Sequence, residues 1–253
     1  MTEDDTLRLL VLGGTAEGNA LARALMGVAG LEVTSSLAGR TIAPRVPPGK
    51  VRVGGFGGAA GLAAYLREHG VGAVVDATHP FAAIMGKNAA EACSATGVPL
   101  LRLERPLWRP GEGDRWTEVA SWEEAARELA RTARHVLLAI GRHELAPFAG
   151  LDDLWFLIRS VEAPQPMPPF RHAELLLARG PFAPEDERTL LSAHRIDTVV
   201  CKNSGGKAAE GKLLAARALG LAVVMRKRPP RPALPTVGTI AEAVAWLSAL
   251  RAP

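Results

Sequence analysis

Half of the lysines in this chain lie within eleven residues, although arginine is its more common cation. The chain has 6 lysines and 24 arginines, and Lys202, Lys207 and Lys212 all fall in the segment CKNSGGKAAEGK. Ammonium groups and the free N–H groups of a glycine turn both attract carboxylates. The segment therefore predicts a site for a ligand with several carboxylates. The alternative is a solvated surface on which lysines cluster by chance.

A second glycine turn lies near the N-terminus, in LLVLGGTAEGNALARAL. An apolar run stops there at two glycines, and a helical pattern begins at once. A strand, a glycine turn and a helix N-terminus together form an anion site. Gly13 and Gly18 occupy the first and last glycine positions of the dinucleotide fingerprint, whereas Thr15 replaces the middle one. The turn predicts binding of a pyrophosphate with help from the Thr15 hydroxyl; a tight turn without a ligand is the alternative.

The end of the next apolar run indicates which nucleotide the first turn would bind. The run closes with VTSSLAGR, which contains Ser36 and Arg40 and has no acid after Glu32. Enzymes that use NAD usually carry an acid here for the ribose hydroxyls, whereas those that use NADP carry small polar residues and an arginine. We therefore expect Ser36 and Arg40 to receive a 2′-phosphate. The alternative is that Arg40 is a solvated loop cation.

Two further runs end in polar or glycine-rich segments, VGGFGG and DATHPFA. Gly54 and Gly55 permit a close approach of the backbone to a ligand. Asp76, Thr78 and His79 would gather at the same edge of the sheet, where open α/β sheets bind ligands. Histidine as a residue type titrates near neutrality, so His79 is the first candidate for a proton donor, and Lys202 is the second. A purely structural histidine, or a proton from solvent, is the alternative.

Several arginines outside these turns are weaker candidates for binding an anionic ligand. Arg179 lies at an element edge in ARGPF, and MRKRPPR follows a late apolar run with Arg226, Lys227 and Arg228. A solvated loop explains the second segment equally well.

Short apolar runs alternate with helical patterns along the chain, which predicts βαβ units and a parallel sheet. The expected strands include LRLLVLGG, LEVTSS, KVRVGG, VGAVVDATHP, VPLLRLERP, RHVLLAIG, LWFLIRSV, IDTVVCKNSGG and LAVVMRKRPP. Ser121 with Glu124 and Thr239 with Glu242 each predict a capping box at a helix start.

Residues 104–116 interrupt this rhythm with proline, glycine and charge, and we interpret them as a linker. The fold class is therefore α/β, with two Rossmann-like three-layer domains whose mostly parallel sheets face a central cleft. We expect residues 1–108 to form a nucleotide-binding domain. Residues 109–253 are expected to form a second Rossmann-like domain that binds substrate carboxylates.

Composition excludes several other classes of protein. The 253 residues carry a net charge of +4, and no Lys/Arg block resembles a nucleic-acid arm. The two cysteines, Cys93 and Cys201, lie in no C-x-x-C motif, which argues against a disulfide scaffold or a zinc site. The polar start MTEDDTLR is unlike a signal peptide, and no run of about 18 apolar residues predicts a membrane span. We expect a cytoplasmic protein without a metal site, a nucleic-acid partner or a membrane partner.

Taken together, GGTAEG, SLAGR, DATHPFA and the late KNSGG resemble the precorrin-6A reductase family of cobalamin biosynthesis. The resemblance runs from Leu9 to about Lys212, and DATHPFA with KNSGG is its most specific pair. It implies an NADPH-dependent oxidoreductase that passes a hydride to a ring carbon of precorrin-6A, giving precorrin-6B. The substrate is a tetrapyrrole with many acetate and propionate groups, which suits a site rich in Lys and Arg. Hand-over to neighbouring pathway enzymes is a further expectation.

The resemblance assigns residues position by position. Those expected to hold NADPH are Gly13, Gly14, Thr15, Ala16, Glu17, Gly18, Ser36, Arg40, Gly54, Gly55, Thr78, His79 and Pro80. Those expected to hold the substrate are Lys202, Asn203, Ser204, Gly205, Gly206, Lys207 and Lys212, with Arg179 and Arg228.

Three alternatives remain open at this point. The substrate could contain cobalt, as in the anaerobic cobalt-precorrin-6A reductases. A non-catalytic NADP-binding sensor would share the N-terminal turns but would not need the lysine-rich turn. A nucleotide-sugar transferase with paired α/β domains would bind a sugar nucleotide instead.

Overall fold

The chain folds into two compact units. The computed structural model describes residues 6–39 and 45–251. The first unit combines Met1–Pro106 with Pro229–Pro253, and the second unit is Leu107–Arg228. No helix within these described ranges is long and apolar enough to cross a membrane.

The first unit is built on six parallel strands in the order β12-β5-β4-β1-β2-β3. They are β1 (Leu7–Leu12), β2 (Leu31–Leu37), β3 (Lys50–Val53), β4 (Ala73–Asp76), β5 (Leu100–Leu103) and β12 (Thr236–Val237). All four residues of β4 are buried. This agrees with the uniformly apolar sequence of a parallel strand that is covered on both faces.

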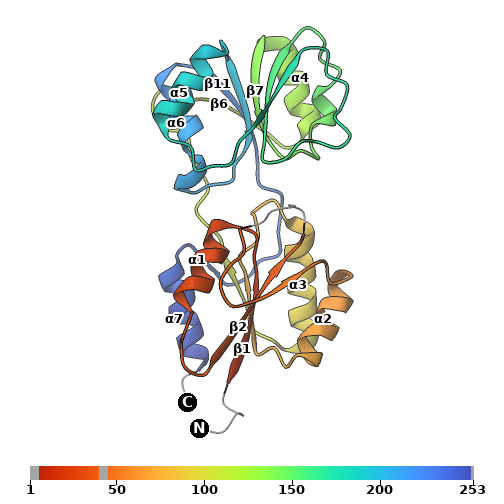
Figure 1. The fold of residues 1–253 in the computed structure, drawn as a ribbon, viewed down its shortest axis with the longest axis vertical. Coiled ribbons are helices and arrows are strands. Elements are labelled where there is room, and N and C mark those ends of the chain that lie inside the picture. The colour runs from red at the N-terminus through yellow and green to blue at the C-terminus, as the bar shows by residue number, and fades with distance from the viewer. Residues whose placement is uncertain (1–5, 40–44, 252–253) are drawn as a thin grey trace. The chain divides into compact units, whose positions relative to one another are not determined.

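Helices cover both faces of this sheet (Figure 1). Helices α1 (Ala16–Ala24) and α7 (Ile240–Leu250) lie on one face, and α2 (Gly58–Glu68) and α3 (Ala83–Thr96) lie on the other. Successive strand residues point to opposite faces. Val11 therefore packs with Leu21 and Leu247, whereas Leu10 packs with Leu62.

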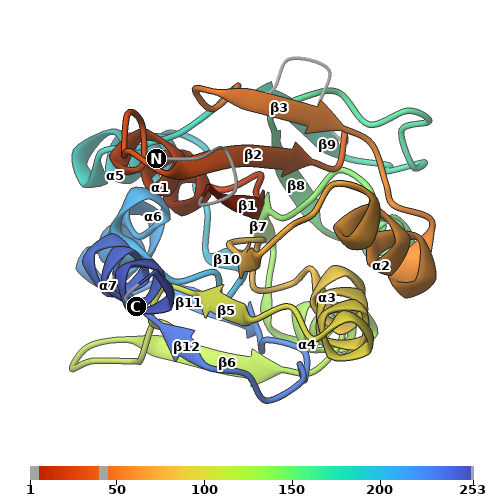
Figure 2. The same cartoon turned by 90° about the horizontal axis from the view of Figure 1, so that it is seen from below.

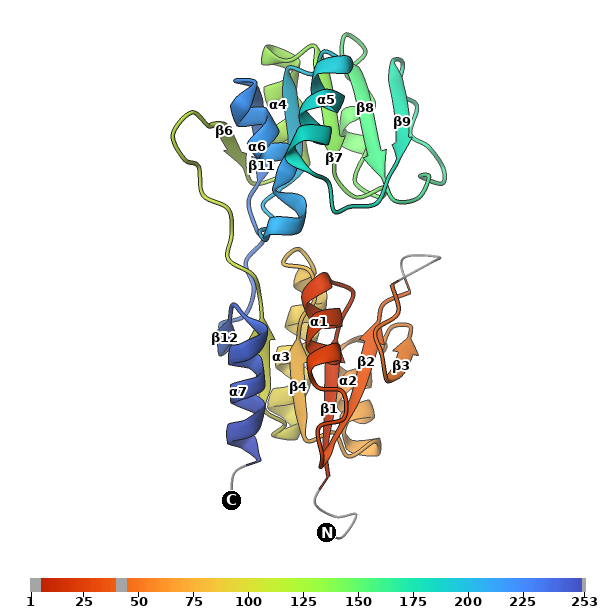
Figure 3. The ribbon, with the colours of Figure 1, turned by 60° about the vertical axis from the view of Figure 1, so that its left-hand side comes forward.

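The second unit repeats the plan with six parallel strands in the order β6-β11-β10-β7-β8-β9. They are β6 (Arg115–Val119), β7 (His135–Ala139), β8 (Trp155–Ser160), β9 (Ala173–Leu177), β10 (Thr198–Lys202) and β11 (Ala222–Arg226). Helix α4 (Trp122–Thr132) and the short η2 (Ala146–Phe148) cover one face. Helices α5 (Pro184–Ala193) and α6 (Gly211–Ala218) cover the other (Figure 3). The expected α/β class with two three-layer units is thus confirmed.

The C-terminal segment joins the first unit, whereas the sequence analysis assigned 109–253 as a whole to the second domain. The return begins after Arg228, and β12 pairs in parallel with β5 through Thr236 and Val237 (Figure 2). Helix α7 then buries Ala243 and Leu247 in the apolar core shared with α1. Without this segment, one face of β4 and β5 would lose its cover.

Candidate active site

The carboxyl ends of the central strands of the first unit meet along one edge. The Gly13 N–H donates to Ser36 O, the Ala77 N–H to Leu12 O and the Gly54 N–H to Leu37 O, each at 2.9 Å. The chain leaves β1 for β2 on one side, while β4 lies on the other side of β1. Such a switch point between neighbouring parallel strands opens a crevice in which α/β proteins bind ligands.

The turn after β1 has open space above it and a tightly packed helix beneath it. Gly14 has a φ of +99°, and a Cβ placed there would meet no atom within 4 Å. A Cβ on Gly18 would instead stand 3.3 Å from Gly13 Cα and 3.5 Å from Ala77 Cβ. The last glycine of the fingerprint is therefore needed for close packing of α1 on the sheet, and the first turn leaves room for a ligand.

Thr15 has a different role from the one expected for it. Its side chain is the N-cap of α1, accepting from Gly18 N at 3.0 Å, and its hydroxyl donates to Ala77 O at 2.7 Å. Both contacts lie within the unit and tie the turn after β1 to the end of β4. The Thr15 hydroxyl is therefore engaged internally, and the free N–H groups of the helix start are the donors that remain for an anion.

We predict that Thr15→Ala lowers the free energy of unfolding by about 1–2 kcal/mol, because it removes the N-cap and the bond to Ala77. Urea titration followed by circular dichroism measures this change. Thr15→Ser retains the hydroxyl and is the matched control, with an expected loss of less than about 0.5 kcal/mol. Equal destabilisation by both variants would show that the methyl group, and not the hydroxyl, supplies the stability.

Glu17 would repel an anion at this turn if its charge were not compensated. Arg105, which follows β5, places Nη1 2.7 Å from Glu17 Oε2, and both side chains are largely buried. The ion pair offsets the acid next to the helix N-terminus. Arg105 could not be predicted from the sequence pattern, because 88 residues separate it from its partner.

Ser36 and the glycine pair after β3 lie on the same edge as the first turn. Ser36 is buried, and its Oγ accepts from Arg52 Nη1 at 2.9 Å. Beyond Gly54 and Gly55 the space is open, since a Cβ on either would meet no atom within 4 Å. Arg40 lies outside the described residues.

The DATHP segment extends the edge from the end of β4. Thr78 donates from its backbone N (3.1 Å) and from its hydroxyl (2.6 Å) to Asp76 Oδ1. The Phe81 N–H donates to His79 Nδ1 at 3.2 Å. Because a backbone N–H only donates, Nδ1 must carry a lone pair, and the proton of the neutral ring then sits on Nε2. Pro80 is buried between these residues.

A cluster of buried charged side chains packs around Asp76, at the start of the DATHP segment. The Asp76 carboxylate is fully buried and accepts from Arg231 Nη2 through its Oδ2, and Arg102 Nε lies 3.8 Å away. Arg231 Nη1 also donates to Glu104 Oε2 at 2.8 Å. Burial, followed by the charge of Arg231, lowers the pKa of Arg102 from its usual value. Asp76 therefore holds two buried guanidinium groups in addition to Thr78.

At the carboxyl edge of the second unit, two cations lie around one acid, Glu144, which was not predicted from the sequence. Glu144, after β7, pairs with Lys202 and lies 3.3 Å from Arg226 Nη1. Its Oε1 also accepts from Trp122 Nε1 at 3.0 Å. Burial alone would raise the pKa of Glu144, but the hydrogen bond and charge of Lys202 hold that pKa below its usual range. Lys202 and Arg226 end adjacent strands, so the acid fixes two cations at this edge.

The KNSGG turn is folded around a tryptophan. Asn203 is buried, its Oδ1 accepts from Trp108 N and its Nδ2 donates to Trp108 O, both at 2.9 Å. The amide of Asn203 therefore serves the backbone of residue 108 and not a ligand. Gly205 and Gly206 have φ values of +69° and +77°, which favour glycine. Arg228 donates to the carbonyls of Asn203 and Ser204 at 3.0 and 3.2 Å, so it braces the turn.

The remaining basic candidates of the second unit differ in exposure. Lys207 is exposed at the start of η3 (Lys207–Ala209). Lys212 is only 6% exposed; its Nζ donates to Ala209 O and lies 4.8 Å from the centre of the Trp108 ring. The buried Lys212 is thus a packing residue of α6, contrary to the expected carboxylate contact. Arg179 is exposed just beyond the edge strand β9.

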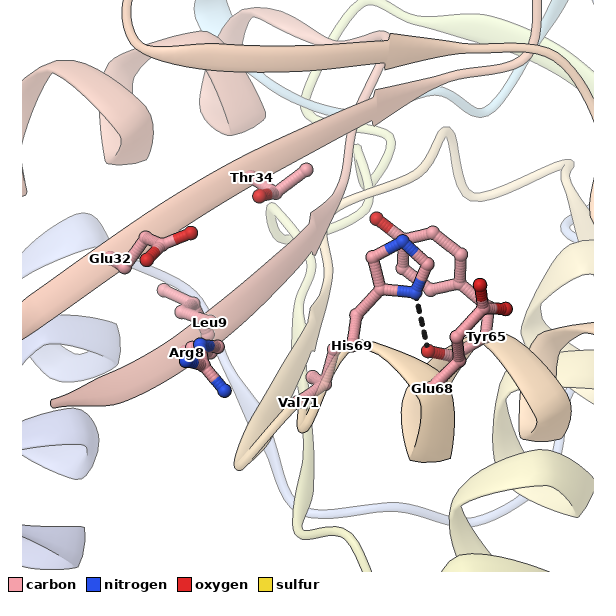
Figure 4. Close-up of a pocket in the computed structure, with 8 residues that line it drawn as sticks. All are labelled: Arg8, Leu9, Glu32, Thr34, Tyr65, Glu68, His69 and Val71. Atoms are coloured by element: carbon pink, nitrogen blue, oxygen red, sulfur yellow. Dashed lines mark hydrogen bonds between the residues drawn. The ribbon is translucent and has the colours of Figure 1, made fainter. Parts of the chain in front are cut away.

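A cavity of about 300 Å³ also lies in the first unit, but at the other end of the sheet (Figure 4). Arg8 and Glu32 near the starts of β1 and β2 line it, together with His69 at the end of α2. His69 stacks on Tyr65 with ring centres 4.0 Å apart. This cavity shares no residue with the glycine-lined edge.

Within the described ranges, no group of three or more His, Cys, Asp or Glu could hold a metal ion.

Comparison with known proteins confirms the resemblance inferred from the motifs. The family model of the precorrin-6x reductases CbiJ/CobK matches residues 8–248. The chain is 53% identical to a precorrin-6A reductase of Rhodococcus erythropolis, covering 96% of this chain and 98% of the relative. It is 31% identical to a cobalt-precorrin-6A reductase of Priestia megaterium, covering 87% and 90% of the two chains.

A solved structure of similar fold gives the same result. A CobK precorrin-6A reductase superposes with a TM-score of 0.91 at 44% identity, and the match covers 97% of each chain. Agreement over the full length, in both fold and sequence, leads to one conclusion: the chain belongs to the precorrin-6x reductase family.

Proposed function

We propose that this protein reduces precorrin-6A to precorrin-6B in cobalamin biosynthesis, with NADPH as the hydride donor. The observation that carries the proposal is the glycine-lined switch point of the first unit, found in a chain that matches precorrin-6A reductases along its whole length. Identities of 53% and 47% to precorrin-6A reductases, against 31% to a cobalt-precorrin-6A reductase, favour the metal-free substrate.

The first unit fits a dinucleotide at its carboxyl edge. Gly14, Gly54 and Gly55 face open space, so a ligand can approach the backbone closely. The start of α1 offers free N–H groups and the positive end of a helix dipole for a pyrophosphate. Bound NADPH would supply the hydride, and the protein would supply orientation and electrostatics. The chain residues assigned to this task are those of the turns at 13–18, 54–55 and 78–80, with Ser36.

The second unit fits an anionic macrocycle. Lys202 and Arg226 stand at adjacent strand ends, and Lys207 is exposed nearby in sequence. Ammonium and guanidinium groups bind carboxylates through charge-assisted hydrogen bonds. We assign Lys202, Ser204 and Lys207 to the substrate carboxylates and His79 Nε2–H to delivery of the proton. Arg228 and Asn203 would act indirectly, by holding the turn.

The reaction would take place in the cytoplasm and pass its product to the next pathway enzyme. Cys93 and Cys201 are free and buried, as expected in a reducing compartment. Burial raises the pKa of Cys93 to about 12, so its thiol would be unreactive.

The decisive experiment follows the loss of NADPH absorbance when purified protein is mixed with precorrin-6A. We expect turnover that requires the macrocycle, is faster with NADPH than with NADH, and is slower with cobalt-precorrin-6A. Binding of NADPH without macrocycle-dependent oxidation would favour a sensor, and binding of a sugar nucleotide would favour a transferase. Faster turnover of the cobalt-containing substrate would reverse the assignment of the metal state.

A further inference from the structure

Arg52 has contacts that set it apart from the arginines that form ion pairs in the first unit. It lies on the edge strand β3, directly beside Ser36 of β2. Its Nη1 donates to Ser36 Oγ at 2.9 Å and to Gly54 O at 3.0 Å, and its Nη2 donates to Gly55 O at 3.1 Å. The guanidinium carbon lies 3.8 Å from the centre of the Phe56 ring. One side chain therefore joins Ser36 to the glycine turn after β3.

Among the residues that the structure describes, no acid neutralises the charge of Arg52. Arg102, Arg105 and Arg231 each pair with a carboxylate. In the described part of the chain, no carboxylate lies within ion-pair distance of Arg52. Its partners are a hydroxyl, two carbonyls and the faces of Phe56 and Tyr65. A half-buried cation without a counter-ion, at a ligand-binding edge, indicates an anionic ligand.

The hydrogen bond to Ser36 also sets the direction in which that hydroxyl can act. A serine hydroxyl has one donor and two acceptor positions. Because Ser36 Oγ already accepts from Arg52, its own proton remains available to an acceptor such as a phosphate oxygen. The turn that Arg52 joins to Ser36 faces open space, since a Cβ on Gly54, which has a φ of +122°, or on Gly55 would meet no atom within 4 Å.

We propose that Arg52 is a positioning residue that selects nucleotides carrying a 2′-phosphate: it orients the Ser36 hydroxyl and supplies the positive charge behind it. This inference rests on the proposed nucleotide site of the first unit, and it names the residue that determines the choice between phosphorylated and unphosphorylated ribose.

The test measures binding, not turnover, by isothermal titration calorimetry. The two probes are adenosine 2′,5′-bisphosphate, which carries the second phosphate, and adenosine 5′-monophosphate, which lacks it. For Arg52→Gln we expect the Kd of the bisphosphate to rise roughly 10- to 100-fold, while that of the monophosphate changes less than about 3-fold. Arg52→Lys keeps the charge but loses the planar fork, so its effect should be intermediate.

Two further variants complete the design. Ser36→Ala removes the hydroxyl but leaves the cation, and it should also weaken the bisphosphate selectively. Lys50→Gln is the matched control, because Lys50 lies on the same strand but is exposed and paired with Glu32; both probes should bind it as they bind the unmodified protein. If Arg52→Gln does not fold, Arg52→Lys and Ser36→Ala decide the question.

The outcomes separate the inference from the function on which it rests. Equal weakening of both probes by Arg52→Gln would overturn the inference, since Arg52 would then only hold the loop. Unchanged selectivity in all Arg52 and Ser36 variants would overturn it as well. If the unmodified protein bound neither these probes nor NADPH, the proposed function itself would fail.

Discussion

Replacing Asp76 with alanine is expected to lower the free energy of unfolding of the first unit by about 3–5 kcal/mol. Asp76 is fully buried and lies against the guanidinium groups of Arg231 and Arg102. With Glu104, the cluster contains two acids and two cations. Removal of one acid leaves an uncompensated positive charge in the interior, and this penalty exceeds what the ion pair itself contributes.

Hydrogen exchange measured by mass spectrometry can follow this loss within each unit. We expect faster exchange in the peptides of β4 and β5, and unchanged exchange in β7 and β10 of the second unit. Glu32→Ala is the control, because the Glu32–Lys50 pair is exposed and should contribute less than about 1 kcal/mol. Near-native protection of β4 in Asp76→Ala would mean that Glu104 alone compensates both arginines.

The same cluster shows what sequence reasoning could not reach. Asp76 was assigned to the correct edge, but Arg231, 155 residues later, was not singled out within MRKRPPR, a segment interpreted as either anion-binding or a solvated loop. Periodicity reports the face of an element, and it contains no information on a partner so distant in sequence. Gly86 in α3 was one indirect sign that another group packs closely against this helix. A mid-helix glycine costs about 1 kcal/mol relative to alanine, and here a Cβ would stand 2.5 Å from Arg231 Nη2.

The strands also divide into those that were predicted from the sequence and those that were missed. Each of the nine runs expected to be strands contains one. Eight of these strands are interior to a sheet, where burial favours apolar sequence, and the ninth, β3, is an edge strand. The strands that were missed, β6, β9 and β12, all lie at sheet edges. Their sequences, RWTEV, AELLL and TV, are mostly exposed, so burial imposes little pattern on them. β12 has only two residues, and its place beside β5 depends on packing of α7.

Local capping was predictable because all of its atoms come from neighbouring residues. The Thr239–Glu242 capping box is confirmed. At Ser121 half of the expected box forms: Ser121 Oγ accepts from Glu124 N at 3.2 Å, but the Glu124 carboxylate accepts from Ala120 N. In the candidate site too, features formed by consecutive residues were easier to predict than contacts between separate segments. The glycine turns were found, whereas Arg105 and Glu144 were not, because each pairs with a residue distant in sequence. Arg52 was missed for another reason: its contact with Ser36 depends on the pairing register of β2 and β3, which the sequence pattern does not give.

The proposed proton donor can be tested by a substitution that preserves its structural contact. His79→Asn places an acceptor near the position of Nδ1, so the Phe81 N–H remains paired, while the Nε2–H is lost. If His79 delivers the proton, kcat should fall about 100-fold, with little change in KM, since general acid catalysis contributes at least that much. Single-turnover rates with saturating NADPH and precorrin-6A measure the effect. His69→Gln is the control, because His69 is exposed at the far end of α2.

Lys202, the second candidate for the proton donor, is expected to respond differently from His79 when it is replaced. Its ammonium is paired with Glu144, so release of a proton would leave that acid without its partner. An ammonium held in this way is better suited to binding a carboxylate than to acid catalysis. Lys202→Met should therefore raise KM for precorrin-6A and leave kcat within a few-fold. If kcat fell in Lys202→Met and not in His79→Asn, the proton would come from the second unit, and the roles assigned to the two residues would have to be exchanged.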